Sequence, residues 1–472
     1  MQKILKRQEI KYLQEWSSRH VHKPLVIRGA RQVGKSTLVR EFVRLADMPM
    51  VEVNFERNPE FREAFAERDP ARIVSTLALL TAREIAPAAT VLFLDEIQAA
   101  PEALVALRYF HEEMPQLRVV AAGSLMEFAL ADARFSMPVG RVEYLHLGPM
   151  EFEDFLEASG NAPLAAHLRG FSLSDLSGGE NVAFPAAVHR RCLDLLRQYC
   201  VVGGLPEAVA EYVDADTNAG EEFARVSRVQ QGIVSAYRDD FHKYGHGRLR
   251  DRIQLVFDKL PAMVGRKFKY VQVSRDHRAA ELSDALRHLC LAGVATRITH
   301  TAANGVPLAA EANERHFKCL CMDVGLMCGA LHLNVLDLAR HDLTLINGGA
   351  LAEQFVGQHL LFSGPRYQAP SLYYWVREAR NAAAEIDYLM TAGQRIVPVE
   401  IKAGTTGSLR SLHQFLQEKQ RDFGLRFNAD VPSLLRDAKR LSNGTAIDYR
   451  LLSLPIYMAG QARRLVGEFD SQ

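Results

Sequence analysis

The chain has 472 residues, 48% of them hydrophobic, and a formal net charge of +1. This length predicts several domains, because single domains usually have about 100–200 residues. The near-neutral charge excludes a whole-molecule attraction to nucleic acid or to a membrane surface, so any nucleic-acid contact must come from a local patch. The sequence contains no apolar signal segment and no uncharged apolar run of 18 residues, so we expect a cytoplasmic protein.

Residues 1–147 alternate apolar strands with helices. Such alternation predicts a parallel sheet covered by helices on both faces, so we expect an α/β nucleotide-binding core here. The expected strands are 24–28, 50–55, 90–94 and 117–122, and the expected helices are 4–16, 35–45, 72–84 and 104–113.

The rest of the chain changes pattern twice. Residues 148–245 are mainly helical and predict a lid on the core, with helices at 151–158, 187–200, 208–212 and 221–241. Residues 246–310 indicate three helical pieces and a strand at 295–299, which suits a winged helix. Residues 311–472 predict an α/β domain, with helices at 349–361 and 408–420 and strands at 372–377, 385–390 and 396–402.

The segment GARQVGKS at 29–36 matches the P-loop pattern and lies between an expected strand and an expected helix. Its glycines allow backbone N–H groups to turn toward phosphates, Lys35 is expected on the β- and γ-phosphates, and the Ser36 hydroxyl on Mg²⁺. The motif therefore predicts ATP and Mg²⁺ as cofactors. The expected nucleotide contacts are Gly29, Ala30, Arg31, Gln32, Val33, Gly34, Lys35, Ser36 and Thr37.

The segment VLFLDE at 91–96 supplies the second half of this site. Its four apolar residues predict a buried central strand whose C-terminal edge carries the two acids. Asp95 is expected to hold Mg²⁺ through water, and Glu96 to polarise the water that attacks the γ-phosphate.

Two further residues are candidates for the same site, each with an alternative. Ser124 ends the next strand, where it could sense the γ-phosphate or merely cap a helix. Arg141 could neutralise transition-state charge, in cis or from a neighbouring subunit, or could form a structural salt bridge.

A second group of charged residues lies near the C-terminus. If the strands that carry Asp387 and Glu400 pair, the two carboxylates and Lys402 would converge; Val397, Val399 and Ile401 would point to the opposite face. The carboxylates could then bind Mg²⁺ and the lysine could activate water at a phosphodiester. Glu353 could supply a further carboxylate ligand. The alternative is a surface salt-bridge cluster.

Residues 251–300 contain nine Lys and Arg against five Asp and Glu, which is more basic than the chain average. This composition is consistent with a nucleic-acid contact, and equally with a solvated helical face.

Taken together, these motifs resemble the bacterial and archaeal AAA-type ATPases that carry an uncharacterised C-terminal domain related to PD-(D/E)xK nucleases. The resemblance also includes VGGLPE at 202–207 and MDVGL at 322–326, which we expect to be turns that join helices. It implies a P-loop core (1–147), a helical lid (148–245), a winged-helix domain (246–310) and a restriction-endonuclease-like domain (311–472). The stretch 172–184 is longer than such proteins usually show.

Three functions remain open from the sequence. The first is an ATPase coupled to a DNA-acting nuclease, whose catalytic residues would be Lys35, Glu96, Ser124, Arg141, Asp387, Glu400 and Lys402. The second is an ATP-driven switch or sensor whose C-terminal domain binds DNA or protein without cleaving. The third is a ring-forming remodelling or transport ATPase. The expected partners are DNA, contacted through residues 251–300 and the C-terminal domain, and further copies of the chain.

Overall fold

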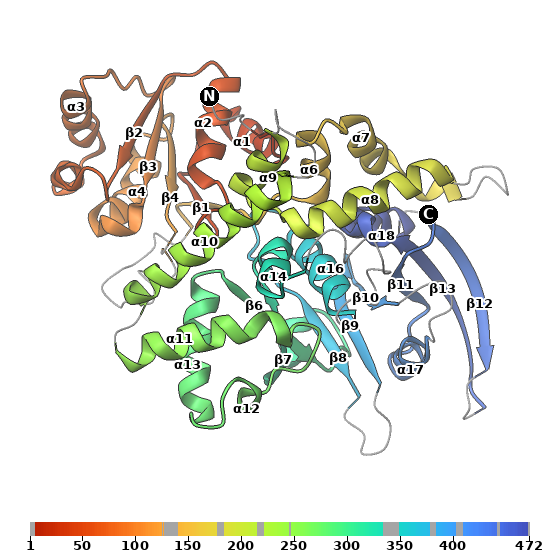
Figure 1. The fold of residues 1–472 in the computed structure, drawn as a ribbon. Helices are drawn as coiled ribbons and strands as arrows, with labels where there is room; N and C mark the ends of the chain where they lie inside the picture. The colour runs from red at the N-terminus through yellow and green to blue at the C-terminus, as the bar shows by residue number, and fades with distance from the viewer. Residues whose placement is uncertain are drawn as a thin grey trace.

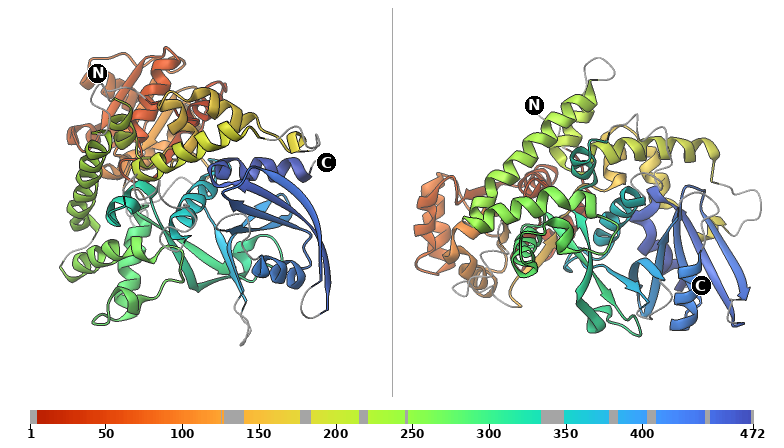
Figure 2. Two further views of the ribbon diagram at one scale, coloured as in Figure 1. Left: turned by 45° about the vertical axis from the view of Figure 1, so that its right-hand side comes forward. Right: turned by 60° about the horizontal axis from the view of Figure 1, so that its bottom comes forward.

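The computed structural model describes residues 5–124, 126, 140–176, 184–214, 221–244, 247–333, 349–377, 384–402, 409–440 and 444–470. Two β-sheets organise this part of the chain, one in the N-terminal part and one in the C-terminal part (Figure 1). Both views of Figure 2 keep the N-terminal sheet at one end of the molecule and the last strands at the other. None of the described helices is both long and apolar enough to cross a membrane.

The N-terminal sheet is parallel throughout and has the order β2-β3-β4-β1-β5, which confirms the predicted parallel sheet. Strand β3, second from the edge of the sheet, is buried along its whole length, because helices cover both faces. Phe93 packs on one face, and Leu92 and Leu94 on the other. The strands are β1 (Leu25–Arg28), β2 (Met50–Asn54), β3 (Val91–Asp95), β4 (Arg118–Ala122) and β5 (Glu143–His146).

The helices of this core follow the predicted order with small shifts at their ends. They are α1 (Glu9–Ser17), α2 (Lys35–Leu45), α3 (Pro70–Thr81) and α4 (Pro101–Glu113). Asp69 accepts hydrogen bonds from the N–H groups of Ala71 and Arg72, and so fixes the start of α3 two residues before the predicted start.

A run of helices then connects the two sheets. It comprises α6 (Phe152–Ala158), α7 (Ala162–Gly170), α8 (Ala186–Val202), α9 (Pro206–Val213), α10 (Glu222–Tyr244), α11 (Arg248–Lys259), α12 (Tyr270–Val273) and α13 (Ala279–Leu291). Figure 1 shows α10 passing between the N-terminal sheet and the helices α11 and α13.

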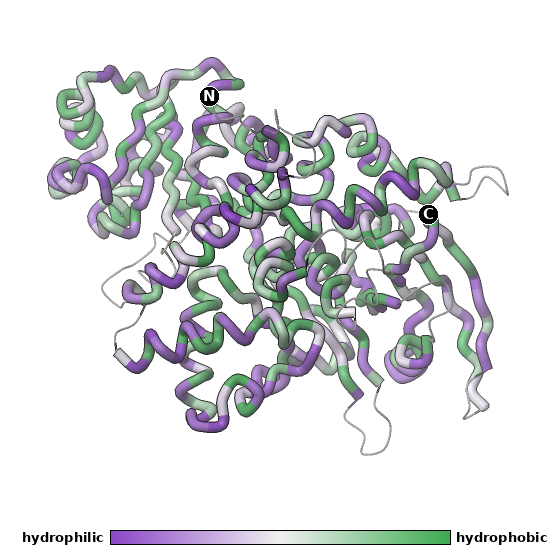
Figure 3. The backbone as a smooth tube through the Cα atoms, viewed as in Figure 1, coloured by the Kyte–Doolittle hydropathy of each residue, from purple (hydrophilic) through white to green (hydrophobic). Residues whose placement is uncertain are grey.

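The C-terminal sheet has eight strands in the order β12-β13-β11-β10-β9-β8-β6-β7. Its strands are β6 (Ala295–Thr301), β7 (Ala312–Cys321), β8 (Tyr373–Val376), β9 (Glu385–Ala392), β10 (Arg395–Ile401), β11 (Phe423–Asn428), β12 (Ser433–Arg440) and β13 (Ala446–Pro455). Its helices are α14 (Val324–Ala330), α16 (Ala350–Phe362), α17 (Arg410–Lys419) and α18 (Ala462–Asp470). Hydrophobic residues concentrate in the central strands, whereas the outer strand β12 is hydrophilic (Figure 3).

The strand expected to close a separate winged helix has a different role. It is β6, which forms an antiparallel pair with β7 and a parallel pair with β8. The expected boundary between residues 310 and 311 therefore falls between two strands of one hairpin, and the helices α11–α13 lead directly into the C-terminal sheet.

Candidate functional site

The P-loop lies at the carboxyl edge of the N-terminal sheet, between β1 and α2. Gly34 precedes α2 with φ of 89°, a conformation that favours glycine, and a Cβ there would lie 3.0 Å from Pro206. A Cβ on Gly29 would lie 2.3 Å from the carbonyl oxygen of Leu147. Close packing therefore leaves no room for a side chain at either glycine of the motif.

Lys35 is the first residue of α2 and is buried in the loop. Its Nζ donates hydrogen bonds to the carbonyl oxygens of Gly29 (2.9 Å) and Ala30 (2.8 Å). Burial lowers the pKa of Lys35 to about 8, although the carboxylates of Glu96 and Asp95 act in the opposite direction. An anion bound in the pocket would therefore stabilise the charged form of Lys35 and raise its pKa again.

Asp95 lies at the end of β3 beside Ser36. The Ser36 hydroxyl donates to both carboxylate oxygens, at 3.1 and 3.0 Å, and the Asn54 amide donates to one of them at 3.2 Å. Burial and then the neighbouring Glu96 raise the pKa of Asp95. Oxygen donors of this kind suit Mg²⁺, so the residues present fit the ion that the motif implies. Asn54 was not predicted; its position at the end of β2, in register with Asp95, is the signal that could have found it.

Glu96 follows Asp95 with a left-handed backbone, φ of 51°. Its carboxylate accepts hydrogen bonds from the Gln98 amide at 2.7 Å and from the Ser124 hydroxyl at 3.3 Å. Ser124 thus contacts Glu96 at the pocket. Gln98, which the sequence analysis missed, also orients the carboxylate.

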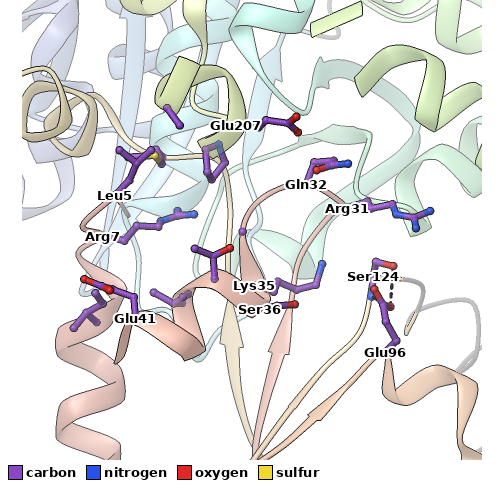
Figure 4. Close-up of a pocket in the computed structure, with 17 residues that line it drawn as sticks. Leu5, Arg7, Arg31, Gln32, Lys35, Ser36, Glu41, Glu96, Ser124 and Glu207 are labelled. Atoms are coloured by element: carbon purple, nitrogen blue, oxygen red, sulfur yellow. Dashed lines mark hydrogen bonds between the residues drawn. The ribbon is translucent and has the colours of Figure 1, made fainter. Parts of the chain in front are cut away.

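A pocket of about 490 Å³ lies between the P-loop and helix α9. Figure 4 shows Arg31, Ser124 and Glu96 at one end of it and Leu5 and Arg7 at the other, with Lys35 and Ser36 in between. Helix α9 contributes Pro206, Glu207 and Ala210 to the lining. A nucleotide with its phosphates at Lys35 would thus contact both the N-terminal core and α9.

Arg141 does not reach this pocket. Its Nε lies 2.8 Å from a carboxylate oxygen of Glu112 on α4, and its side chain is 47% exposed. The geometry within one chain therefore matches the structural salt bridge that was the alternative interpretation. A role in cis would require that pair to break.

The two motifs without assigned chemistry contact each other. The Asp323 carboxylate accepts hydrogen bonds from the N–H groups of Gly204 (2.7 Å) and Leu326 (3.1 Å), and a Cβ on Gly325 would lie 2.6 Å from the Gly203 nitrogen. The first motif joins α8 to α9 as expected. The second joins β7 to α14, so the expectation of two helices was wrong there. Together they fix the start of α9, and hence Pro206, against the P-loop.

In the C-terminal sheet, β9 and β10 pair antiparallel, and their register ends at Val399 opposite Tyr388. One step further, this register places Asp387 opposite Glu400. The Asp387 carboxylate accepts a hydrogen bond from the Ile401 N–H at 2.8 Å. Val397 and Val399 face the main core as predicted, so the two acids share the opposite face.

Glu400 is fully buried, with 0% of its surface exposed. Its Oε2 lies 2.7 Å from the Lys402 ammonium and forms an ion pair with it. Burial, followed by the charge of Asp387, raises the pKa of Glu400 to about 8. Burial acts against the charge on Lys402, but Glu400 and Asp387 outweigh it and raise the pKa of Lys402.

Glu353 lies on α16 and has a partner that the sequence analysis missed. The buried Lys318 of β7 places its Nζ 3.3 Å from Glu353 and also pairs with Glu385. Burial raises the pKa of Glu353 to about 7, with Lys318 opposing and Asp387 adding to the shift. Within the described ranges, no three His, Cys, Asp or Glu side chains form a group that could hold a metal ion. The cluster is an ion-pair network, although a buried one rather than the surface cluster considered above.

We expect Glu400→Gln to raise the stability of the protein at pH 8 and to flatten its pH dependence. The folded-state pKa near 8 lies above the ordinary value of 4.5, so the contribution of Glu400 to stability is greatest below pH 4.5 and falls as the pH rises toward 8. The difference in unfolding free energy between pH 5 and pH 8 should shrink by on the order of 2–4 kcal/mol. Urea unfolding at both pH values measures it. The exposed Glu102→Gln is the control, and equal pH dependence in both variants would contradict the prediction.

Residues 21–156 match the family described as the AAA domain. The N-terminal part of the chain is an AAA-type P-loop ATPase domain. C-terminal to the AAA domain in the sequence, two further families match. They are DUF8612 (residues 193–337) and DUF4143 (residues 348–442), both described as domains of unknown function. No curated protein matches the chain.

Several solved structures resemble the chain at low identity. The Walker-type ATPase PABY2304 of Pyrococcus abyssi is 15% identical with a TM-score of 0.43, and the match covers 70% of this chain and 96% of that one. The Aeropyrum pernix ORC2 protein is 13% identical with a TM-score of 0.35, covering 74% and 98%. The Thermotoga maritima RuvB Holliday junction branch migration motor is 18% identical with a TM-score of 0.29, covering 62% and 90%. Because all three TM-scores are below 0.5, none of them is used to infer what the chain binds.

Proposed function

We propose that the chain is a Mg²⁺-dependent ATPase whose nucleotide cycle controls a DNA-acting site in the C-terminal sheet. The observation that carries the ATPase part is one pocket lined by Lys35, Ser36 and the oriented carboxylate of Glu96, with Asp95 hydrogen-bonded to the Ser36 hydroxyl. These are the groups that phosphoryl transfer to water requires.

Each residue has a defined task in this proposal. Lys35 and the N-terminus of α2 bind the β- and γ-phosphates. Ser36 and Asp95 would hold Mg²⁺, which neutralises charge on the phosphate oxygens when bound. Glu96 accepts a hydrogen bond from the attacking water and so aligns it with the γ-phosphorus, while Gln98 and Ser124 keep the carboxylate in place.

The proposed DNA contact rests on the basic segment that precedes the C-terminal sheet. Arg266, Lys267 and Lys269 lie exposed between α11 and α12, and none of them forms an ion pair with another described residue. By contrast, Arg252 pairs with Glu281, and Arg287 pairs with Asp284. Unpaired exposed cations are the groups that bind phosphate backbones.

The C-terminal acids support a phosphodiester chemistry. Glu400 is fully buried beside Asp387, and the Lys402 ammonium lies 2.7 Å from its Oε2, so this site already places a positive charge next to two carboxylates. Asp387 and Glu400 would hold a divalent ion, and Lys402 would orient water or the phosphate. Glu353 could bind the same divalent ion only if its ion pair with Lys318 broke.

Incubation with plasmid and linear DNA tests this part of the proposal. The parent, Lys35→Ala and Lys402→Ala proteins are compared in Mg²⁺ or Mn²⁺, with and without ATP. We expect cleavage by the parent and a loss of at least about hundredfold in Lys402→Ala. Dependence of cleavage on Lys35 would link it to ATP. Equal cleavage by Lys402→Ala would contradict the assignment of the site.

The second candidate is an ATP-driven switch that binds DNA or protein without cleaving it. The ion pairs of Lys402 with Glu400 and of Lys318 with Glu353 favour it, because they partly neutralise the acids in place of a metal. Nucleotide-dependent binding of plasmid without cleavage under any metal would support this candidate. A nucleotide-dependent rise in mass would instead support a ring assembly.

A further inference from the structure

Residue Arg31 of the P-loop contacts helix α10 through both its side chain and its carbonyl oxygen. The Arg31 guanidinium forms an ion pair with Asp240, and the Tyr237 hydroxyl donates to the Arg31 carbonyl oxygen at 2.5 Å. The turn after α13 also packs on the loop, since a Cβ on Gly293 would lie 3.1 Å from the Ala30 Cβ. A nucleotide-binding loop is therefore in direct contact with the elements that lead to the C-terminal sheet.

Arg31 also faces the nucleotide pocket. It lines the pocket together with Lys35, Glu96 and Ser124, and Figure 4 shows it at the end where Ser124 and Glu96 lie. Its side chain is 31% exposed, whereas that of Asp240 is only 8% exposed. The Arg31 side chain thus borders the end of the pocket that Ser124 and Glu96 line, and it is more accessible from that pocket than its partner Asp240.

The chemistry of the two partners favours such a competition. A guanidinium binds a carboxylate and a phosphate with the same two-pronged geometry, and the γ-phosphate carries more negative charge than the carboxylate. ADP has no γ-phosphate and therefore lacks this anion. With its β- and γ-phosphates at Lys35, ATP would offer Arg31 a competing anion.

We propose that Arg31 is a positioning residue that exchanges Asp240 for the γ-phosphate of ATP and thereby reports the nucleotide state to α10. The inference rests on the proposed nucleotide site and adds the route by which that site influences the rest of the chain. The route continues from α10 into α11, because Arg238 of α10 and Asp258 of α11 form an ion pair at 2.8 Å. Helix α11 precedes the exposed residues Arg266, Lys267 and Lys269 that are proposed to contact DNA.

The test compares affinities for Mg²⁺ with ADP and for Mg²⁺ with a non-hydrolysable ATP analogue, by calorimetry on the full chain. We expect Asp240→Asn to tighten binding of the analogue roughly tenfold and to leave ADP binding nearly unchanged, because the competitor for Arg31 is gone. Arg31→Gln should abolish the preference for the triphosphate, and Arg31→Lys should restore part of it. The exposed Asp239→Asn, one residue away on α10, controls for the loss of a negative charge.

A gain of affinity cannot come from misfolding, so Asp240→Asn tests the inference even if Arg31→Gln fails to fold. An unchanged ratio of analogue affinity to ADP affinity in Asp240→Asn would overturn the partner exchange while leaving the proposed nucleotide site intact. Failure of the parent to bind either nucleotide would overturn both. Hydrogen exchange gives a second readout: amides of α10 should exchange faster with the analogue than with ADP in the parent, and equally fast with both in Arg31→Gln.

Discussion

Replacing Glu96 by Gln is expected to lower kcat for ATP hydrolysis at least about hundredfold and to leave nucleotide affinity within about twofold. Gln keeps the shape of the side chain and its contacts with Gln98 and Ser124, but a neutral amide no longer attracts the proton of the attacking water. The phosphates are bound elsewhere, by Lys35 and the start of α2. Steady-state phosphate release gives kcat, and calorimetric titration with a non-hydrolysable analogue gives the affinity.

The control for this variant is Glu113→Gln, the same change at an exposed position of α4. It should hydrolyse ATP as the parent does. If Glu96→Gln retained more than about a tenth of the parental kcat, water activation by Glu96 would be wrong and the group that aligns water would have to be sought elsewhere.

Replacing Lys35 by Ala is expected to weaken ATP binding about hundredfold or more, because it removes a charge-assisted contact with two phosphates. The same change should not destabilise the free protein. The ammonium is buried with its pKa lowered to about 8, so its burial costs free energy until a phosphate compensates. Thermal unfolding with and without Mg²⁺ and ATP measures both effects.

The parent should gain several degrees in Tm on adding the nucleotide, and Lys35→Ala should gain almost none. Lys23→Ala, at an exposed position before β1, should behave as the parent. An equal nucleotide-induced rise in Tm in the parent and in Lys35→Ala would show that the pocket of Lys35 is not the nucleotide site.

Local patterns predicted the parallel sheet and the position of the P-loop in the N-terminal part of the chain. The P-loop and the acids after β3 are short motifs whose geometry is set by a strand, a turn and a helix dipole, so their residues needed no long-range information. The pairing of Asp387 with Glu400 was also predictable, because the alternation of Val397 and Val399 fixed which face the acids would share. The AAA match covers this part of the chain and confirms the coarser assignment.

The contacts that the sequence analysis missed join distant segments. Lys318 meets Glu353 across 35 positions, and Arg31 meets Asp240 across 209, so no local spacing indicates either pair. Strand β6 was predicted, but its place in the C-terminal sheet depends on its pairing with β8, in which Thr299 lies opposite Tyr373, 74 positions later in the sequence. The outer strand β12 has an exposed, charged pattern that resembles a loop.

The most direct test of the account is phosphate release from ATP by the purified chain, with Mg²⁺ or with chelator, with and without plasmid DNA. The proposed site predicts hydrolysis that needs Mg²⁺, disappears in Glu96→Gln and changes in rate when DNA is added. A folded parent protein that binds Mg²⁺ and ATP but releases no phosphate under any of these conditions would contradict the ATPase assignment. Hydrolysis that DNA leaves unchanged would contradict the coupling to DNA.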